Sequence, residues 1–210
     1  MAANDRQQTL DATFGSVCKS VHCSPERQQT LEEVIQLAVE LAREGREGRK
    51  IGTLFVVGDV ETVLEQSRSL LLDPLYGHPS ELLHVTRPEF RETIKELAQL
   101  DGAFVVGDDG TFVSAGRFID VDVSNPENFM PGLGTRHAAA ASISRTARAV
   151  AVAVSQSSVV RVFAKGLLRA EIIPELFLMS RDGFFTPDAE ITQMATAGVT
   201  LAVAPDGSPA

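Results

Sequence analysis

Residues 132–142 read Gly-Leu-Gly-Thr-Arg-His-Ala-Ala-Ala-Ala-Ser, and this stretch decides the fold. Alanine is the strongest helix former, so the pattern predicts a tight glycine loop that runs into a helix beginning near Thr135 or Arg136. The hydroxyl of Thr135 suits the N-cap position. A helix start offers unpaired backbone N–H groups and a positive dipole end, and Arg136 adds a planar fork of donors. The stretch is therefore either a simple turn or a phosphate-binding loop.

A second stretch, 31 residues before Gly132, bears on that choice. Asp101-Gly102-Ala103 directly precedes the apolar run 104–106, so the triplet lies where a turn enters a strand. Taken together, the triplet and the later Gly134-Thr135-Arg136-His137 resemble the nucleotide-binding domain of the diadenylate cyclases. That family carries an Asp-Gly-Ala triplet followed, roughly thirty residues on, by Gly-Thr-Arg-His before an alanine-rich helix. The resemblance covers about residues 50–172, and the order and spacing of both motifs match.

The resemblance implies a fold and an activity. The fold is α/β, a single domain with a central mixed β-sheet flanked by helices on both faces. The activity is the condensation of two ATP molecules into cyclic di-AMP with release of two pyrophosphates, assisted by Mg²⁺ or Mn²⁺. Each protomer holds one ATP, so the resemblance also implies a face-to-face homodimer or a higher homo-oligomer.

The same resemblance carries over site residues at the matching positions. Asp101, Arg136 and His137 are expected to be catalytic, with Asp101 and His137 as metal ligands. A carboxylate at Asp101 suits an ion that activates the attacking hydroxyl. Ile119 matches a position that contacts adenine, although plain core packing explains it equally well. The ATP-binding residues are expected to be Gly102, Ala103, Ile119, Gly134, Thr135, Arg136, Ser155 and Gln156.

Two departures from the family pattern leave an alternative open. Ala138 stands where the family often has a second arginine, and Ser155-Gln156-Ser157 stands where it often has Ser-Glu-Glu. The second change removes two carboxylates, for which Asp120 or Asp122 could compensate. The alternative function is a catalytically weakened nucleotide-binding or sensory module on the same fold. A generic α/β interaction protein would require both motifs to be coincidental.

Composition limits the partners and the location. The chain of 210 residues carries a net charge of −9, which argues against a general electrostatic grip on nucleic acid. No apolar run approaches the ~20 residues of a membrane helix, and the first residues do not resemble a signal peptide, so we expect a cytoplasmic protein. Cys18 and Cys23 are expected to be thiols. A metal site formed with His22 is the weaker alternative, because these three residues do not complete one.

The remaining pattern predicts the domain organisation. Residues 1–24 are expected to be an N-terminal extension whose spacing of apolar residues permits a short helix. Residues 25–190 are expected to form the cyclase-like domain, and residues 191–210 a tail whose end is disordered. The charged run 43–50 is either a solvated loop or a basic nucleotide patch. Helices are expected over 25–44, 60–68, 87–100 and from about 135; strands are expected over 51–57, 103–106, 111–119, 149–154, 159–164 and 167–173.

Overall fold

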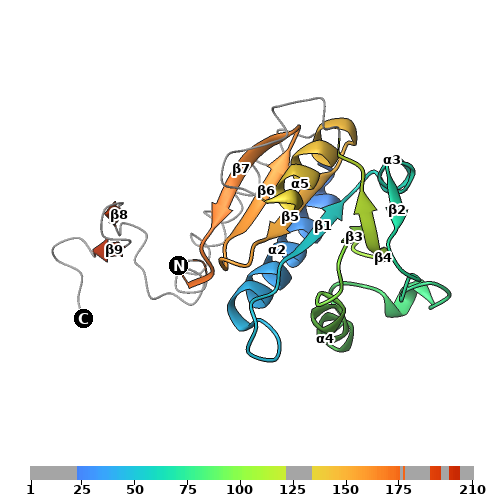
Figure 1. Ribbon diagram of the computed structural model, residues 1–210, viewed down its shortest axis with the longest axis horizontal. Helices are drawn as coiled ribbons and strands as arrows, with labels where there is room; N and C mark the ends of the chain where they lie inside the picture. Colours follow the sequence, from blue (N-terminus) through green and yellow to red (C-terminus); the bar gives the residue numbers. More distant parts are fainter. Residues whose placement is uncertain (1–22, 122–133, 176, 178–189, 195–198, 204–210) are drawn as a thin grey trace.

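A computed structural model of the chain describes residues 23–121, 134–175, 177, 190–194 and 199–203 (Figure 1). The helices are α2 (Pro25–Glu44), α3 (Val60–Glu65), the 3₁₀ turn η1 (Ser80–Leu82), α4 (Pro88–Leu97) and α5 (Thr135–Thr146). The strands are β1 (Thr53–Val57), β2 (Ser67–Ser69), β3 (Ala103–Val106), β4 (Phe112–Ile119), β5 (Val150–Val154), β6 (Val160–Ala164), β7 (Leu167–Ile172), β8 (Glu190–Met194) and β9 (Val199–Val203).

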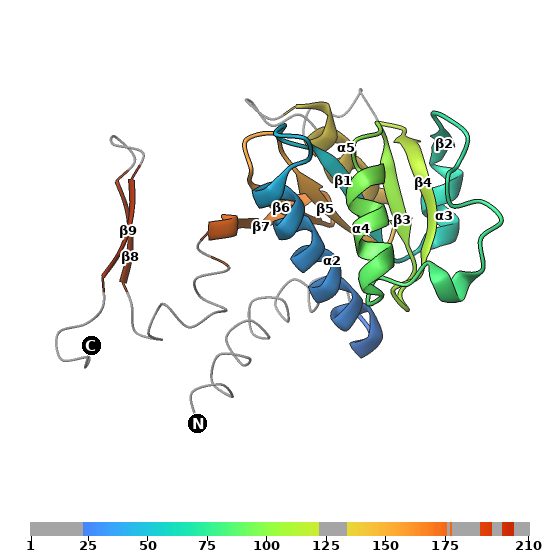
Figure 2. The ribbon, with the colours of Figure 1, turned by 90° about the horizontal axis from the view of Figure 1, so that it is seen from below.

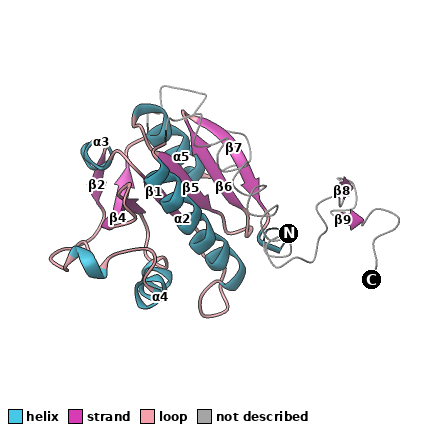
Figure 3. Ribbon diagram, turned by 180° about the vertical axis from the view of Figure 1, so that it is seen from behind, coloured by secondary structure: helices cyan, strands magenta, loops and turns pink. Residues whose placement is uncertain are grey.

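Seven strands form one mixed sheet in the order β2-β4-β3-β1-β5-β6-β7. Strands β1 and β3 run parallel, and the other neighbouring pairs run antiparallel. Helices α2 and α4 cover one face of the sheet, and α5 lies on the opposite face (Figure 2). Helix α2 crosses the middle strands of the sheet when the molecule is seen from behind (Figure 3). The predicted mixed α/β fold is therefore confirmed.

Strand β5 shows how the two faces differ. Its valines, Val150, Val152 and Val154, belong to the core under α2, whereas Ala151 and Ala153 belong to the core under α5. Side chains alternate between the faces of a strand, so a Val-Ala alternation gives one bulky face and one smooth face. The small alanines of α5 meet that smooth face, so the start of α5 lies close to the sheet.

Local residues set both ends of α2. The Ser24 hydroxyl accepts a hydrogen bond from the Arg27 N–H at 3.1 Å, and Pro25 takes the first helical position. Gly45 ends the helix with a φ of 61°, which favours glycine. The charged run that follows is held by ion pairs of Arg46 with Glu92 and Glu96, which supports a structural loop rather than a nucleotide patch.

Two expectations from the sequence were wrong. The predicted helix over 60–68 ends at Glu65, and Ser67–Ser69 instead pair with β4 as an edge strand. Arg117 of β4 causes this, because its guanidinium donates to the carbonyl oxygens of Leu64 and Ser67. The helix expected over 87–100 ends at Leu97, and Leu100 beyond it is 42 % exposed.

Some expectations concern residues outside the described ones. The N-terminal helix within residues 1–24 falls almost wholly there, as do Cys18, His22 and the loop with Asp122. The tail contributes the hairpin of β8 and β9, a separate two-stranded sheet that the sequence analysis did not anticipate. Among the described residues, no helix combines the length and apolar composition needed to cross a bilayer.

Candidate active site

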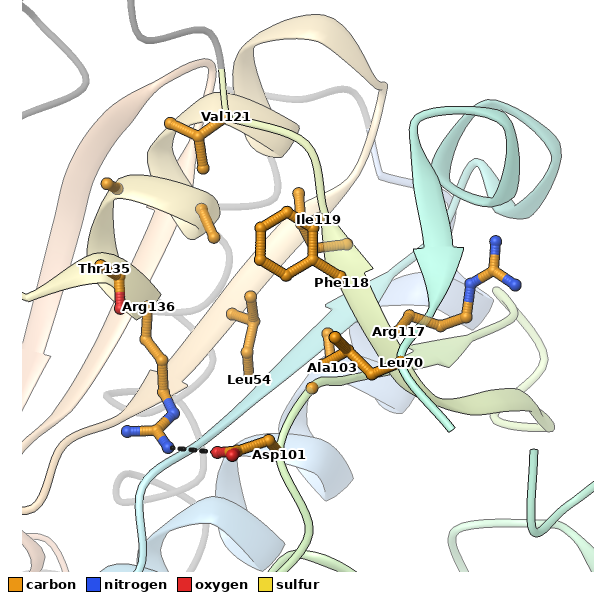
Figure 4. A pocket seen from close by; sticks show the side chains of 13 residues that line it. Leu54, Leu70, Asp101, Ala103, Arg117, Phe118, Ile119, Val121, Thr135 and Arg136 are labelled. Carbon is orange, nitrogen blue, oxygen red and sulfur yellow. Dashed lines mark ion pairs between the residues drawn. The ribbon is translucent and has the colours of Figure 1, made fainter. Parts of the chain in front are cut away.

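The main cavity lies at the amino ends of the parallel strands β1 and β3 and has a volume of about 550 Å³ (Figure 4). This volume is within the range of small-molecule sites. One part of the wall is apolar, and another carries the carboxylate of Asp101 and the guanidinium of Arg136. The lining residues are Leu54, Leu70, Asp101, Gly102, Ala103, Arg117, Phe118, Ile119, Val121, Thr135, Arg136, Ala138 and Ala139.

The two sequence motifs meet in this cavity. Asp101, Gly102 and Ala103 enter it from the start of β3, and Thr135 and Arg136 enter it from the first turn of α5. Some 30 residues of chain separate the two segments, so the sheet order and the seat of α5 on the sheet bring them together. Ile119, at the end of β4, also lines the cavity.

The start of α5 differs in one detail from the expectation. Gly134, not Thr135, is the N-cap residue, and no side chain caps the helix. The first intrahelical bond is accepted by the Gly134 carbonyl from the His137 N–H at 3.0 Å. The N–H groups of Thr135 and Arg136 precede that bond, so the helix start keeps donors that an anion could use.

Arg136 and Asp101 point toward one another across the mouth of the cavity (Figure 4). Arg136 Nη2 lies 3.6 Å from Asp101 Oδ1, and the two side chains are 35 % and 88 % exposed. A pair this exposed contributes little to stability. Its importance is positional, because it places one cation and one carboxylate side by side at the rim of an apolar pocket.

Gly102 has a packing role in addition to lining the cavity. Its φ is 110°, and a Cβ atom there would lie 2.6 Å from the carbonyl carbon of Gly116 in β4. A side chain at this position would therefore meet both backbone strain and a neighbouring strand. The absence of a side chain at Gly102 thus allows a close approach to β4.

His137 is not brought to the cavity. It is 8 % exposed, and its ring packs toward Phe163 with the centroids 6.2 Å apart. Arg161 Nη1 donates to His137 Nε2 at 3.2 Å, and Arg161 Nε in turn donates to Glu171 at 2.5 Å. Burial lowers the pKa of His137, and the nearby Arg161 and Arg136 lower it further, so the ring is neutral near pH 7.

Ser155 and Gln156 lie in the turn between β5 and β6, and neither lines the cavity. The Ser155 hydroxyl interacts with Ser157 Oγ at 2.8 Å and with the Val159 carbonyl at 3.0 Å, so it stabilises the turn. Gln156 is exposed. Gly134 is exposed and adjoins the lining residue Thr135.

A divalent ion would find one suitable protein ligand here. The Asp101 carboxylate is exposed at the cavity mouth, and Mg²⁺ is commonly held by one or two carboxylates together with substrate phosphates and water. Within the described ranges, no group of three or more His, Cys, Asp or Glu side chains could hold a metal ion by itself. The donor set therefore fits an ion that arrives with a nucleotide.

Seven lining residues were not among the predicted site residues: Leu54, Leu70, Arg117, Phe118, Val121, Ala138 and Ala139. Arg117 and Phe118 directly precede Ile119 on β4, so the position of Ile119 was the available signal. Arg117 donates to the hydroxyls of Ser67 and Ser69, each at 3.1 Å. It therefore fixes the edge strand β2, whose continuation carries Leu70 to the wall of the cavity.

The fold and the site together define a class: a mixed α/β domain whose pocket opens at the amino ends of its parallel strands. The chain belongs to the family described as DisA bacterial checkpoint controller nucleotide-binding (DAC), whose model matches residues 40–168. It is 45 % identical over 159 residues to a diadenylate cyclase of Methanocaldococcus jannaschii, covering 74 % of this chain and 49 % of that protein.

A second relative agrees with this membership, and a solved structure shares the fold. A diadenylate cyclase of Haloferax volcanii is 37 % identical over 150 residues, covering 70 % of this chain and 54 % of that protein. The chain thus spans about half the length of the curated relatives it matches. A solved structure of a hypothetical membrane-spanning protein from Bacillus cereus has a TM-score of 0.50 at 23 % identity, covering 66 % of this chain and 61 % of that one, and supports the fold alone.

Proposed function

We propose that this domain is a diadenylate cyclase that condenses two ATP molecules into cyclic di-AMP and releases two pyrophosphates. The observation that carries the proposal is the convergence of Asp101 and Arg136, 3.6 Å apart, at the rim of a largely apolar pocket. Family membership and the names of two relatives support it. The apolar wall suits a nucleobase, and the charged rim suits a triphosphate with its metal ion.

The proposed roles follow from the geometry. Arg136 and the uncapped N–H groups at the start of α5 would hold phosphate oxygens, since both are donors that favour negative charge. Ile119, Leu54 and Phe118 would contact adenine on the apolar wall. Gly102 and Ala103 would shape the floor, and Gly134 and Thr135 would form the phosphate loop. Ser155 and Gln156 stay predictions, because their turn does not line the cavity.

Asp101 would hold Mg²⁺ or Mn²⁺ together with the phosphates. When bound, such an ion lowers the pKa of a coordinated hydroxyl and offsets phosphate charge. In each condensation the 3′-oxygen of one ATP forms a bond to the α-phosphorus of the other. The bond between that phosphorus and the oxygen bridging it to the β-phosphorus breaks, and the hydroxyl proton and pyrophosphate leave. His137 could join the ion only by turning out of its contact with Arg161, so the proposal gives Asp101 the principal role.

Each product contains two nucleotides joined symmetrically, while the described part of one chain carries one such pocket. We therefore propose that two protomers meet face to face around their cavities. This arrangement needs only one self-complementary surface patch on each protomer. The acidic chain is not expected to bind nucleic acid, and a cytoplasmic site of action is consistent with its ATP substrate.

The test is incubation of the purified chain with ATP and MnCl₂, followed by chromatographic separation of cyclic di-AMP and detection of pyrophosphate. Formation of both products in a one-to-two ratio is the expected result. ATP binding without either product would instead favour the weakened nucleotide-binding or sensory module. Ala138 and the exposed Gln156, which replace an arginine and a carboxylate of the family pattern, are the observations behind that alternative.

A further inference from the structure

Gly52, directly before β1, lies beneath the guanidinium of Arg136. A Cβ atom built on Gly52 would lie 2.5 Å from Arg136 Nη1 and 3.0 Å from Arg136 Cζ. Real Cβ atoms do not approach other atoms this closely. The guanidinium therefore occupies the space that any other residue at position 52 would fill.

The backbone at Gly52 does not itself require glycine. Eight glycines of the described chain have a positive φ, and Gly52 is not among them. A side chain at this position would therefore meet no left-handed strain. Its remaining close neighbour is the Val154 carbonyl oxygen of β5, at 3.2 Å, where a Cβ is tight but tolerable. The more severe conflict is with Arg136.

The sheet order explains why this position matters for the site. Strand β1 lies between β3 and β5, and Thr53 pairs with Val154. The Arg136 side chain extends from α5 over Gly52, beside the end of β5, and reaches Asp101 at the start of β3. The guanidinium thus lies directly against the backbone of Gly52.

We propose that Gly52 is a positioning residue for Arg136, holding its guanidinium beside Asp101 at the cavity mouth by the absence of a side chain. The consequence for nucleotide binding rests on the proposed function, since it assumes that Arg136 binds the ATP phosphates. The displacement of the guanidinium does not rest on it. The two statements can therefore be tested separately.

The first measurement needs no ligand. The Nε–Hε resonance of Arg136, assigned with Arg136→Lys, should shift in Gly52→Ala because the guanidinium must move. The matched control is Gly107→Ala, at the opposite end of β3. There an added Cβ would lie 2.6 Å from the flexible end of Asp109, and φ is likewise not positive. That control should leave the Arg136 resonance in place, and an unshifted resonance in Gly52→Ala would overturn the proposal.

The second measurement is a double-mutant cycle on the affinity for a non-hydrolysable ATP analogue with MnCl₂. Gly52→Ala should weaken binding by about tenfold, a loss typical of one charge-assisted hydrogen bond. In an Arg136→Ala background it should have no further effect, because the side chain with which it clashes is gone. Equal losses in both backgrounds would mean that Gly52 acts through Val154 or the fold, and the proposal would be wrong.

Folding and activity give the remaining controls. If Gly52→Ala alone fails to fold, Arg136→Ala should rescue it, whereas a defect caused by Val154 would persist in the double variant. A parent chain that binds the analogue but forms no cyclic di-AMP would contradict the proposed activity. The double-mutant cycle would still test the role of Gly52 in that case. A parent that binds no nucleotide would contradict the proposed function, and the ligand-free resonance would still decide the role of Gly52.

Discussion

Asp101 is highly exposed and lies at the start of β3, beside Arg136. Its side chain is 88 % exposed, and its carboxylate lies 3.6 Å from Arg136 at the cavity mouth. Exposed ion pairs contribute about 0–1 kcal/mol, so this carboxylate has little structural work. A substitution of Asp101 should therefore change the catalytic activity and leave the stability of the fold nearly unchanged.

We expect Asp101→Asn to abolish cyclic di-AMP formation, because an amide is nearly isosteric but a poor ligand for a divalent ion. The free energy of unfolding should change by less than about 0.5 kcal/mol, as for other exposed positions. Chromatography of the ATP reaction and urea unfolding measure the two quantities. Glu89→Gln, an exposed carboxylate on α4, is the charge-matched control. Undiminished turnover in Asp101→Asn would remove this residue from the metal role.

Arg136→Ala is expected to weaken ATP binding by about 1.5–3 kcal/mol, the range for hydrogen bonds to charged groups. The ATP affinity of Arg136→Lys should fall between those of the parent and of Arg136→Ala, since lysine keeps the charge and loses the planar fork of donors. Isothermal calorimetry with ATP and MnCl₂ gives the affinities. Equal affinity in parent and Arg136→Ala would exclude the phosphate contact.

For His137 the structure and the family pattern point in different directions. The ring is buried against Arg161, which donates to its Nε2, so we expect His137→Gln to leave the Mn²⁺ concentration for half-maximal activity unchanged. His137→Leu should lower the free energy of unfolding by about 2 kcal/mol, because Arg161 loses its acceptor. A tenfold higher Mn²⁺ requirement in His137→Gln would instead support the predicted role as a metal ligand.

At the scale of elements, the segment joining β1 to α3 is tied to the start of β5. The Asp59 carboxylate accepts hydrogen bonds from the Arg148 N–H at 2.7 Å and from the Thr62 hydroxyl at 2.9 Å. Burial alone would raise the pKa of Asp59. The hydrogen bonds from Arg148 and Thr62 outweigh this effect and lower the pKa below its ordinary value of 3.8.

This shift predicts a pH-dependent contribution to stability. Because the pKa is lower in the folded chain, the stabilisation is complete above the ordinary value and is lost as pH falls through the folded value. Asp59→Asn should therefore cost about 1 kcal/mol at pH 7, a figure reduced for solvent screening, and less at an acidic pH well below 3.8. Urea unfolding of both proteins at the two pH values measures this. A cost that stays constant with pH would show that the ionised carboxylate is not responsible.

The long elements could be predicted from the sequence because their signals are local. Ser24, Pro25 and Gly45 mark the ends of α2, and the unbroken apolar run before Gly58 marks β1. Strand β2 could not be predicted in this way. It depends on Arg117, 50 residues away, which binds the backbone at Ser67 and is invisible to local propensity.

The same distinction holds in the site. The motifs pointed to Asp101, Gly102, Ala103, Thr135 and Arg136, and the structure places these five residues around one cavity. They could not indicate the direction of each side chain. Successive helical residues are turned by about 100°, so while Arg136 faces the cavity, the next residue, His137, faces the sheet. The contact between Gly52 and Arg136 could not be predicted from the motifs either, because it depends on the order of the strands in the sheet.

At the scale of the molecule, the cavity is at an unusual end of the sheet. Ligands of open parallel sheets generally bind beyond the carboxyl ends of the strands. Here the cavity is at the amino ends of β1 and β3, and the carboxyl ends carry the turns at Gly58 and Gly107. Much of the sheet is antiparallel, so the general rule for parallel sheets does not apply to this fold. The position of the site therefore follows from its residues.

The last prediction concerns assembly. The proposed function requires two cavities to meet so that two nucleotides can be joined. Each chain carries a net charge of −9, so free protomers repel at long range. Specific activity should therefore rise with enzyme concentration before it levels off, and the rise should begin at lower concentration in 0.2 M salt than in 0.02 M, because salt screens the repulsion. Activity assays over a dilution series, with light scattering at each point, measure both effects. Full activity at a concentration where light scattering finds only monomers would exclude the two-protomer mechanism.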